Sequence, residues 1–163
     1  MNSTPRARRM TLTALLLATA AAMPALAHHS FAIFNMEQTK VFTGVVTRIN
    51  PDANHLQIFF APMNDERKGV VRSADGKPVV WAVEMAGSAQ AATQGISVSS
   101  LPPGTYISVA LHPLRSGEPA GSRAEGGAIF RCPDKKAPAA GKHCDSVDGN
   151  IPLGQGALAQ PKD

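Results

Sequence analysis

Short stretches in which apolar and polar residues alternate dominate the chain after its first forty positions. Residues 41–49 (V-F-T-G-V-V-T-R-I) are rich in β-branched side chains, and a period of two places Val41, Val45 and Ile49 on one face. Residues 55–60 (H-L-Q-I-F-F) alternate in the same way, with the aliphatic residues on one side. The pattern predicts two half-buried strands.

A third strand follows a turn signal. Residues 70–72 and 78–85 flank Asp75-Gly76, a pair that suits the positive-φ positions of a tight hairpin turn. Alternation through W-A-V-E-M places Trp81 on the apolar side, where it is the main aromatic residue of the predicted core, and Glu84 on the opposite side.

One short helix interrupts the predicted strands. Ser88 is placed to cap a run of good helix formers, A-Q-A-A-T-Q, and Gly95 to end it. Strands are expected at 106–112 and 128–131, with a long flexible turn across 117–127. This order predicts a mostly β fold: a small five- to six-stranded OB-fold-like barrel with one short helix between the third and fourth main strands. A small sandwich with one helix is the main alternative.

The first 27 residues have the features of a secretory signal peptide. Arg6, Arg8 and Arg9 precede an apolar run of 13 residues, and Pro24 and the triplet Ala25-Leu26-Ala27 then supply a small-residue cleavage site. The apolar run is shorter than the roughly 20 residues that span a bilayer. We therefore expect cleavage after Ala27 and a periplasmic or secreted protein with no membrane span, the alternative being a retained anchor.

Cleavage lowers the net charge of the chain. Removing 27 of the 163 residues leaves 136, and removing three arginines reduces the net charge from +4 to +1. This charge gives no support to nucleic acid as a partner. The expected organisation is a cleaved signal peptide at 1–27, an N-terminal segment at 28–40, a β-barrel domain at 41–132, and a disulfide-stapled loop with a flexible tail at 133–163.

Two cysteines suit an exported protein. Cys132 and Cys144 are an even pair at short separation, which favours a structural disulfide in an oxidising compartment. Metal thiolates or a haem site are the competing interpretations, but the chain has no C-x-x-C or C-x-x-C-H motif. His143, inside this loop, is interpreted as structural or solvated.

Histidines form the sharpest candidate site. A processed His28 would offer both its α-amine and its imidazole to one metal ion, and nitrogen ligands favour Cu(II) among the common divalent ions. His29, His55 and His112 could complete such a set. Copper is thus the possible cofactor. Two other interpretations remain open, namely incidental copper affinity of an exposed amino terminus and no metal role at all.

The other candidate residues form a hypothetical ligand face: Gln57, Glu84 and Arg115. Glu84 has a simpler interpretation as a surface acid paired with a cation. The sequence contains no G-x-S-x-G, H-E-x-x-H or P-loop motif, so we expect no enzyme.

Several motifs together resemble one family. The mature start His28-His29-Ser30-Phe31-Ala32 is similar to that of an uncharacterised family of exported bacterial proteins, the domain of unknown function 6152. Further pieces that fit its pattern are Asn54-His55, Asp75-Gly76-Lys77 leading into Trp81–Met85, Leu101–Gly104, and His112–Gly117. The family typically has Asn-Pro-His before the second strand, where this chain has N-P-D-A-N-H. The resemblance implies export and a small β-barrel, and it supplies no activity.

These patterns together predict an exported ligand-binding or accessory module. Its partner is an unknown ligand or a periplasmic protein. Copper or other metal binding through His28 is the alternative function.

Overall fold

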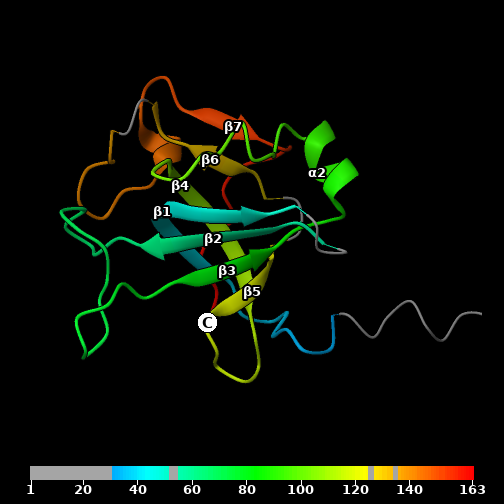
Figure 1. Cartoon of the computed structure of the whole chain (residues 1–163), viewed down its shortest axis with the longest axis horizontal. Coiled ribbons are helices and arrows are strands. Elements are labelled where there is room, and N and C mark those ends of the chain that lie inside the picture. The colour runs from blue at the N-terminus through cyan, green and yellow to red at the C-terminus, as the bar shows by residue number, and fades with distance from the viewer. Residues whose placement is uncertain (1–30, 52–54, 125–126, 134–135) are drawn as a thin grey trace, which may run out of the picture. The chain divides into compact units, whose positions relative to one another are not determined.

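The computed structural model describes residues 31–51, 55–124, 127–133 and 136–163. The chain divides into two units, residues 1–33 and 34–163. The described residues of the first unit, 31–33, form a turn. The second unit contains every strand discussed below (Figure 1).

The second unit is a mostly β fold with a closed five-stranded barrel and additional strands. The elements in chain order are β1 (Lys40–Asn50), β2 (Gln57–Pro62), β3 (Trp81–Glu84), α2 (Ser88–Thr93), β4 (Tyr106–Pro113), β5 (Ala120–Arg123), β6 (Ile129–Arg131), the 3₁₀ helix η2 (Cys144–Ser146) and β7 (Ile151–Leu153). Within the barrel the strands neighbour one another in the order β1-β2-β3-β5-β4, and β4 pairs with β1 to close it. The β3–β5 pair is parallel and the other barrel pairs are antiparallel. This confirms the predicted OB-like barrel, with its helix between β3 and β4.

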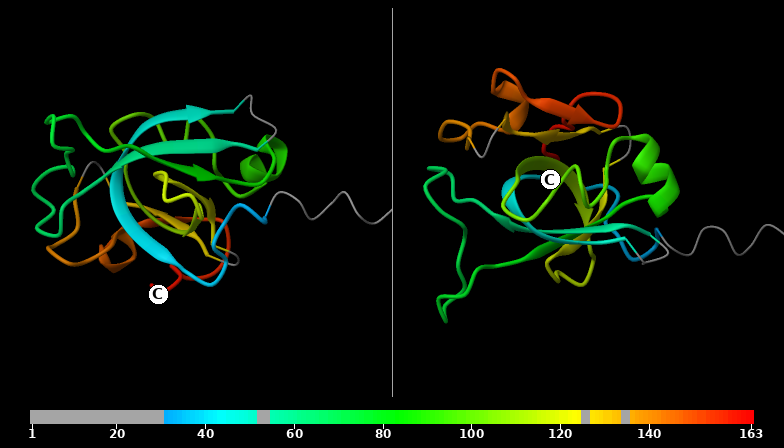
Figure 2. Two further views of the ribbon diagram at one scale, coloured as in Figure 1. Left: turned by 90° about the horizontal axis from the view of Figure 1, so that it is seen from below. Right: turned by 45° about the horizontal axis from the view of Figure 1, so that its top comes forward.

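Strand β1 closes the barrel because it bends. Its first half pairs with β4 and its second half with β2, and Gly44 pairs with both. Figure 2 shows the curve of this strand. A Cβ at Gly44 would lie 2.6 Å from Cδ2 of Phe60, so only glycine lets the two strands approach this closely at the bend.

The predicted inner face of β1 was wrong at Val41 and Val45. Val46 is buried in the main core, and Phe42 and Ile49 pack against it. The register shifts between Val46 and Arg48, as a β-bulge requires, and a bulge changes which residues face inward. The other predicted inner rows are confirmed, because Leu56, Ile58, Phe60, Val83, Met85, Ile107, Val109 and Leu111 are all buried.

Two features near the helix also differ from prediction. Gly87 occupies the N-cap and Ser88 is the first helical residue, and the Ser88 hydroxyl donates to the carbonyl of Pro51 and does not cap the helix. Trp81 is only partly buried, whereas Phe60 is fully buried. The Asp75-Gly76 turn is present, with Gly76 at a φ of 80°, although the described residues flanking it form only the single bridge Arg72–Pro78.

Residues 117–127, predicted as a flexible turn, contain the fifth barrel strand, β5. The backbone there is extended and pairs with β3 and β4, and the Ala124 amide continues the ladder by donating to the carbonyl of Ala110. A Cβ at Gly121 would lie 2.4 Å from the carbonyl oxygen of His112. The close contact between β4 and β5 requires small residues here. Because these residues are not β-branched, the sequence pattern did not predict a strand.

The tail, predicted to be flexible, adds structure outside the barrel. β7 pairs with β6, Leu158 is buried beside Ala110 and Ala124, and Lys162 forms a backbone bridge with Thr39. This second small core covers part of the outer face of β1 and β4. Its apolar residues are few and interrupted by glycine, so no periodicity revealed it.

Candidate functional site

Four polar residues lie side by side across four strands of the barrel. Gln57 of β2 faces Glu84 of β3, Glu84 faces Ser122 of β5, and Ser122 faces His112 of β4. Directly opposed residues project from the same face of a sheet. Their neighbours along the strands, including Ile58, Val83 and Leu111, belong to the core. We call these four outward-facing residues the polar row.

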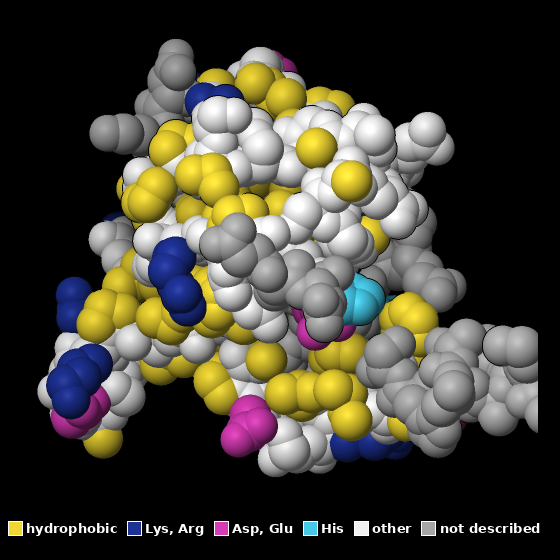
Figure 3. All heavy atoms as spheres, turned by 45° about the vertical axis from the view of Figure 1, so that its right-hand side comes forward, with side chains coloured by type: hydrophobic (Ala, Val, Ile, Leu, Met, Phe, Trp, Pro, Cys, Tyr) yellow, Lys and Arg dark blue, Asp and Glu magenta, His cyan; other side chains and the backbone are white. Residues whose placement is uncertain are grey.

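His55 extends the polar row at its exposed end. It precedes Gln57 by two residues, and its Nδ1 lies 3.7 Å from Oε1 of Glu84 and 3.1 Å from the carbonyl oxygen of Met85. A carbonyl oxygen can only accept, so Nδ1 carries the proton and Nε2 presents its lone pair in the neutral ring. On the face shown in Figure 3, a histidine side chain lies beside an acidic one.

His112 lies at the other, buried end of the polar row and has the same tautomer. Its Nδ1 donates to the carbonyl oxygen of Gln38 at 2.8 Å, and only 8% of the residue is exposed. The segment that contains Gln38 is held against β4, because the Asn35 amide donates to the carbonyl of Pro113. In their neutral form both His55 and His112 therefore present Nε2 as an acceptor.

Ser122 is the member of the polar row that the sequence did not reveal. It is 6% exposed, and its Oγ is buried without a hydrogen-bond partner among the described residues. Leaving a buried polar group unpaired costs about 1–3 kcal/mol. Ser122 lies in a glycine-rich stretch that the sequence predicts as a turn, so no pattern placed it on a strand.

The structure gathers some of the predicted site residues and leaves others apart. Gln57, Glu84, His55 and His112 share the outer face of one sheet, whereas Arg115 lies exposed in the turn between β4 and β5. His28 and His29 lie outside the described residues. Within the described ranges, no group of three His, Cys, Asp or Glu residues could hold a metal ion. The four-histidine metal set therefore stays a prediction.

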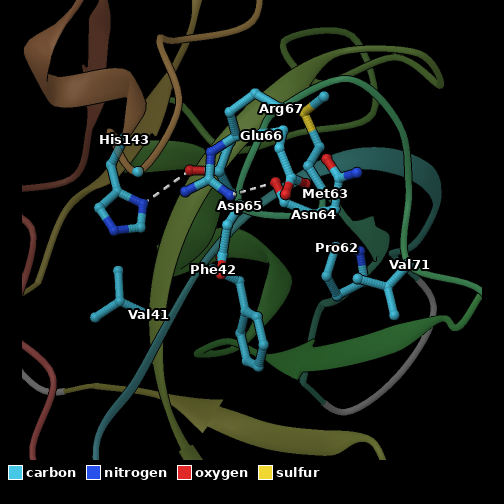
Figure 4. Close-up of a pocket in the computed structure, with 12 residues that line it drawn as sticks. Val41, Phe42, Pro62, Met63, Asn64, Asp65, Glu66, Arg67, Val71 and His143 are labelled. Atoms are coloured by element: carbon cyan, nitrogen blue, oxygen red, sulfur yellow. Dashed lines mark hydrogen bonds between the residues drawn. The ribbon is translucent and has the colours of Figure 1, made fainter.

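A pocket of about 580 Å³ lies beside the polar loop that follows β2, between the start of β1 and residues 141–143 (Figure 4). His143 lines it, and its Nδ1 lies 2.8 Å from Oγ1 of Thr43. The Thr43 hydroxyl lies 2.7 Å from the Ser108 hydroxyl, which accepts from the Cys144 amide. This chain of hydrogen bonds ties the stapled loop to the barrel, so His143 is structural.

The electrostatics of this pocket favour the neutral form of His143. Burial lowers the pKa of the imidazole, the positive charge of Arg67 lowers it further, and Asp145 opposes both. Arg67 is itself held by the carbonyl oxygens of Asn64 and Lys142. The Cys132–Cys144 disulfide, with the Cα atoms 4.9 Å apart, confirms the predicted pairing and is compatible with an extracellular or periplasmic location.

No helix in the described part of the chain is long and apolar enough to cross a membrane. No curated protein and no solved structure matches the chain. Residues 16–123 match the Family of unknown function (DUF6152), so the match includes all five strands of the closed barrel and ends with β5. Because this region is well over half of the sequence, the chain belongs to the Family of unknown function (DUF6152).

Proposed function

We propose that the protein is an exported, non-enzymatic module that binds a small ligand at the exposed end of the polar row, over His55, Gln57 and Glu84. The in-register alignment of Gln57, Glu84, Ser122 and His112 on one outer face carries the proposal. A small number of placed polar side chains fixes the orientation of a ligand in known binding sites, and the exposed end of this row supplies three of them. The disulfide and the signal-peptide pattern support export.

The chemistry of this end favours a cationic hydrogen-bond donor. Nε2 of His55 and the Glu84 carboxylate are both acceptors, and Glu84 has no Lys or Arg ion-pair partner among the described residues. A small organic amine supplies both the positive charge and the donors that such a pair needs. Binding is favoured over catalysis because no hydroxyl of the polar row is bonded to a histidine in the described part of the chain.

Putrescine, a small diamine, is a suitable probe. Isothermal titration and ¹H–¹⁵N spectra of the histidine rings should show saturable binding that shifts the His55 signals. Glu84→Gln should weaken binding at least tenfold, while Glu118→Gln, an exposed acid in the β4–β5 turn, should leave it unchanged. No saturable binding, or equal loss in both variants, would contradict the proposal.

Copper binding by the processed amino terminus is a second candidate. The observation that favours it is the tautomer of His55 and His112, because histidines that bind a metal through Nε2 usually donate Nδ1–H to a carbonyl or carboxylate. The His28 amine and imidazole would be the first ligands and His55 a further one.

Amino-terminal processing makes this second candidate testable. Exported protein that begins at His28 should bind Cu(II) at near-unit stoichiometry, and one extra alanine placed before His28 should weaken binding sharply. Unchanged copper affinity, or a mature terminus other than His28, would contradict this second proposal.

A further inference from the structure

A second, separate hollow of about 640 Å³ lies between helix α2, the end of β5 and the turn after β7. Uncharged hydrogen-bonding side chains dominate its lining, and none of the described residues that line it is acidic. Those used in the argument are Gln90, Thr93, Gln94, Arg123, Gly154 and Gln155. The hollow shares no residue with the polar row.

Arg123 supplies the only formal charge among these residues. It is the last residue of β5 and lies opposite Leu111, a core residue of β4, so its side chain leaves the sheet on the side away from Ser122. The guanidinium is half-buried and donates from one terminal nitrogen to Oε1 of Gln94 at 2.8 Å. Burial lowers the pKa of this guanidinium, and no described charge opposes that effect.

The Arg123 charge is uncompensated within the described residues. Lys77 pairs with Asp75, the Glu84 carboxylate lies near the His55 ring, and neither contact includes Arg123. A guanidinium has five N–H donors, and a neutral amide oxygen accepts from only one of them here. The guanidinium therefore has donors left for an anion, and its partial burial strengthens the attraction between them.

Gly154 keeps the space in front of the guanidinium open. Its φ is +89°, and a Cβ there would lie 3.1 Å from a terminal nitrogen of Arg123 and 3.4 Å from Oε1 of Gln94. The Gly154 amide also donates to the carbonyl of Gln94 at 3.0 Å, which fixes the turn against α2. The backbone thus approaches closely where a side chain would fill the hollow.

We propose that this hollow is an oxyanion-binding site, in which Arg123 holds a carboxylate or phosphate group of a small molecule. The planar guanidinium matches either group with two parallel hydrogen bonds. The side-chain amides of Gln90 and Gln155 supply further hydrogen bonds to the rest of the ligand, whereas the Thr93 hydroxyl already donates to the carbonyl of Gln90. The site prefers an anion, whereas the polar row prefers a cation, so the two proposals stand or fall separately.

The test is a titration of the full mature chain with inorganic phosphate and, separately, with succinate, in a chloride-poor buffer. The signal of the Arg123 Nε–H group should shift saturably with one of the two, which also identifies the type of oxyanion. Arg123→Gln should weaken that binding at least tenfold. Arg72→Gln, which changes an exposed arginine in the hairpin turn, should leave it unchanged.

A second variant covers the case in which Arg123→Gln disturbs folding. Gln90 lies exposed on α2, so Gln90→Glu should fold normally while placing a negative charge at the hollow. It should weaken anion binding at least tenfold and leave putrescine binding unchanged. Absence of saturable binding of both anions, or equal binding by wild type and Gln90→Glu, would overturn the proposal.

Discussion

Thr43 and His143 share a hydrogen bond of 2.8 Å although one hundred residues separate them along the chain. Thr43 lies on β1 of the barrel, and His143 immediately precedes the disulfide cysteine Cys144. The contact joins the strand that closes the barrel to the loop that lies over it. Stability should therefore depend on the protonation state of His143.

Stability should fall as pH drops below neutrality, in part because of His143. The unfolded chain titrates this residue near an ordinary pKa of about 6.5, whereas burial and Arg67 lower the pKa in the folded protein. Between these two values the unfolded chain binds more protons, so protonation favours unfolding until the pH passes below the folded pKa. Urea midpoints from pH 8 to pH 5 should show a smaller decline in His143→Asn, which does not titrate. An identical pH dependence in both proteins would contradict this role.

Two serines on adjacent barrel strands should respond to truncation with opposite signs. The Ser108 hydroxyl bonds to Thr43 and to the Cys144 amide, so Ser108→Ala should destabilise by about 1–3 kcal/mol. The Ser122 hydroxyl has no partner among the described residues, so Ser122→Ala should be neutral or stabilise by up to about 1 kcal/mol. Urea unfolding of both variants measures the difference, and equal destabilisation would show that Ser122 is hydrogen-bonded.

Gly121 should not tolerate a side chain. A Cβ would lie 2.4 Å from the His112 carbonyl oxygen and 2.6 Å from a Leu111 methyl carbon. We expect Gly121→Ala to destabilise by about 3 kcal/mol because the β4 backbone must move. Gly69→Ala is the matched control, since nothing lies within 4 Å of a Cβ there. Similar melting temperatures for the two variants would contradict the close approach of β4 and β5.

Removing the disulfide should loosen the loop between Cys132 and Cys144 as well as destabilise the fold. The bond joins residues 12 apart, and closing a loop of this length is worth about 3 kcal/mol in the chain-entropy model. Cys132→Ser with Cys144→Ser should lose about that much and also expose the Ser108 and Thr43 amides to hydrogen exchange. Unchanged exchange at these two amides would show that the barrel holds the loop without the disulfide.

Sequence patterns predicted the strands whose inner rows are large and regular. Leu56, Ile58 and Phe60 alternate without interruption, so period two was sufficient to orient β2. The pattern failed at β1 because the irregularity after Val46 shifts the register, and no residue type marks that position. β5 was missed because Gly121 is required by contact with another strand, which only the folded structure reveals.

The sequence predicted which residues belong to the candidate site, but it did not predict how they are aligned across the strands. His55, Gln57, Glu84 and His112 were identified from their positions on expected strands, but their alignment depends on pairing with β5. Arg123 was not identified, because no motif contains it. Its significance comes from partial burial and from the lack of an acidic partner among the described residues. Tertiary context of this kind is absent from local sequence.

The bridge between Thr39 and Lys162 has a practical consequence for the metal experiments. Thr39 adjoins Gln38, whose carbonyl holds the ring of His112. A polyhistidine tag fused after Asp163 would begin two residues from Lys162 of this bridge and would place many competing imidazoles near His112. Copper stoichiometry should therefore be measured on untagged protein.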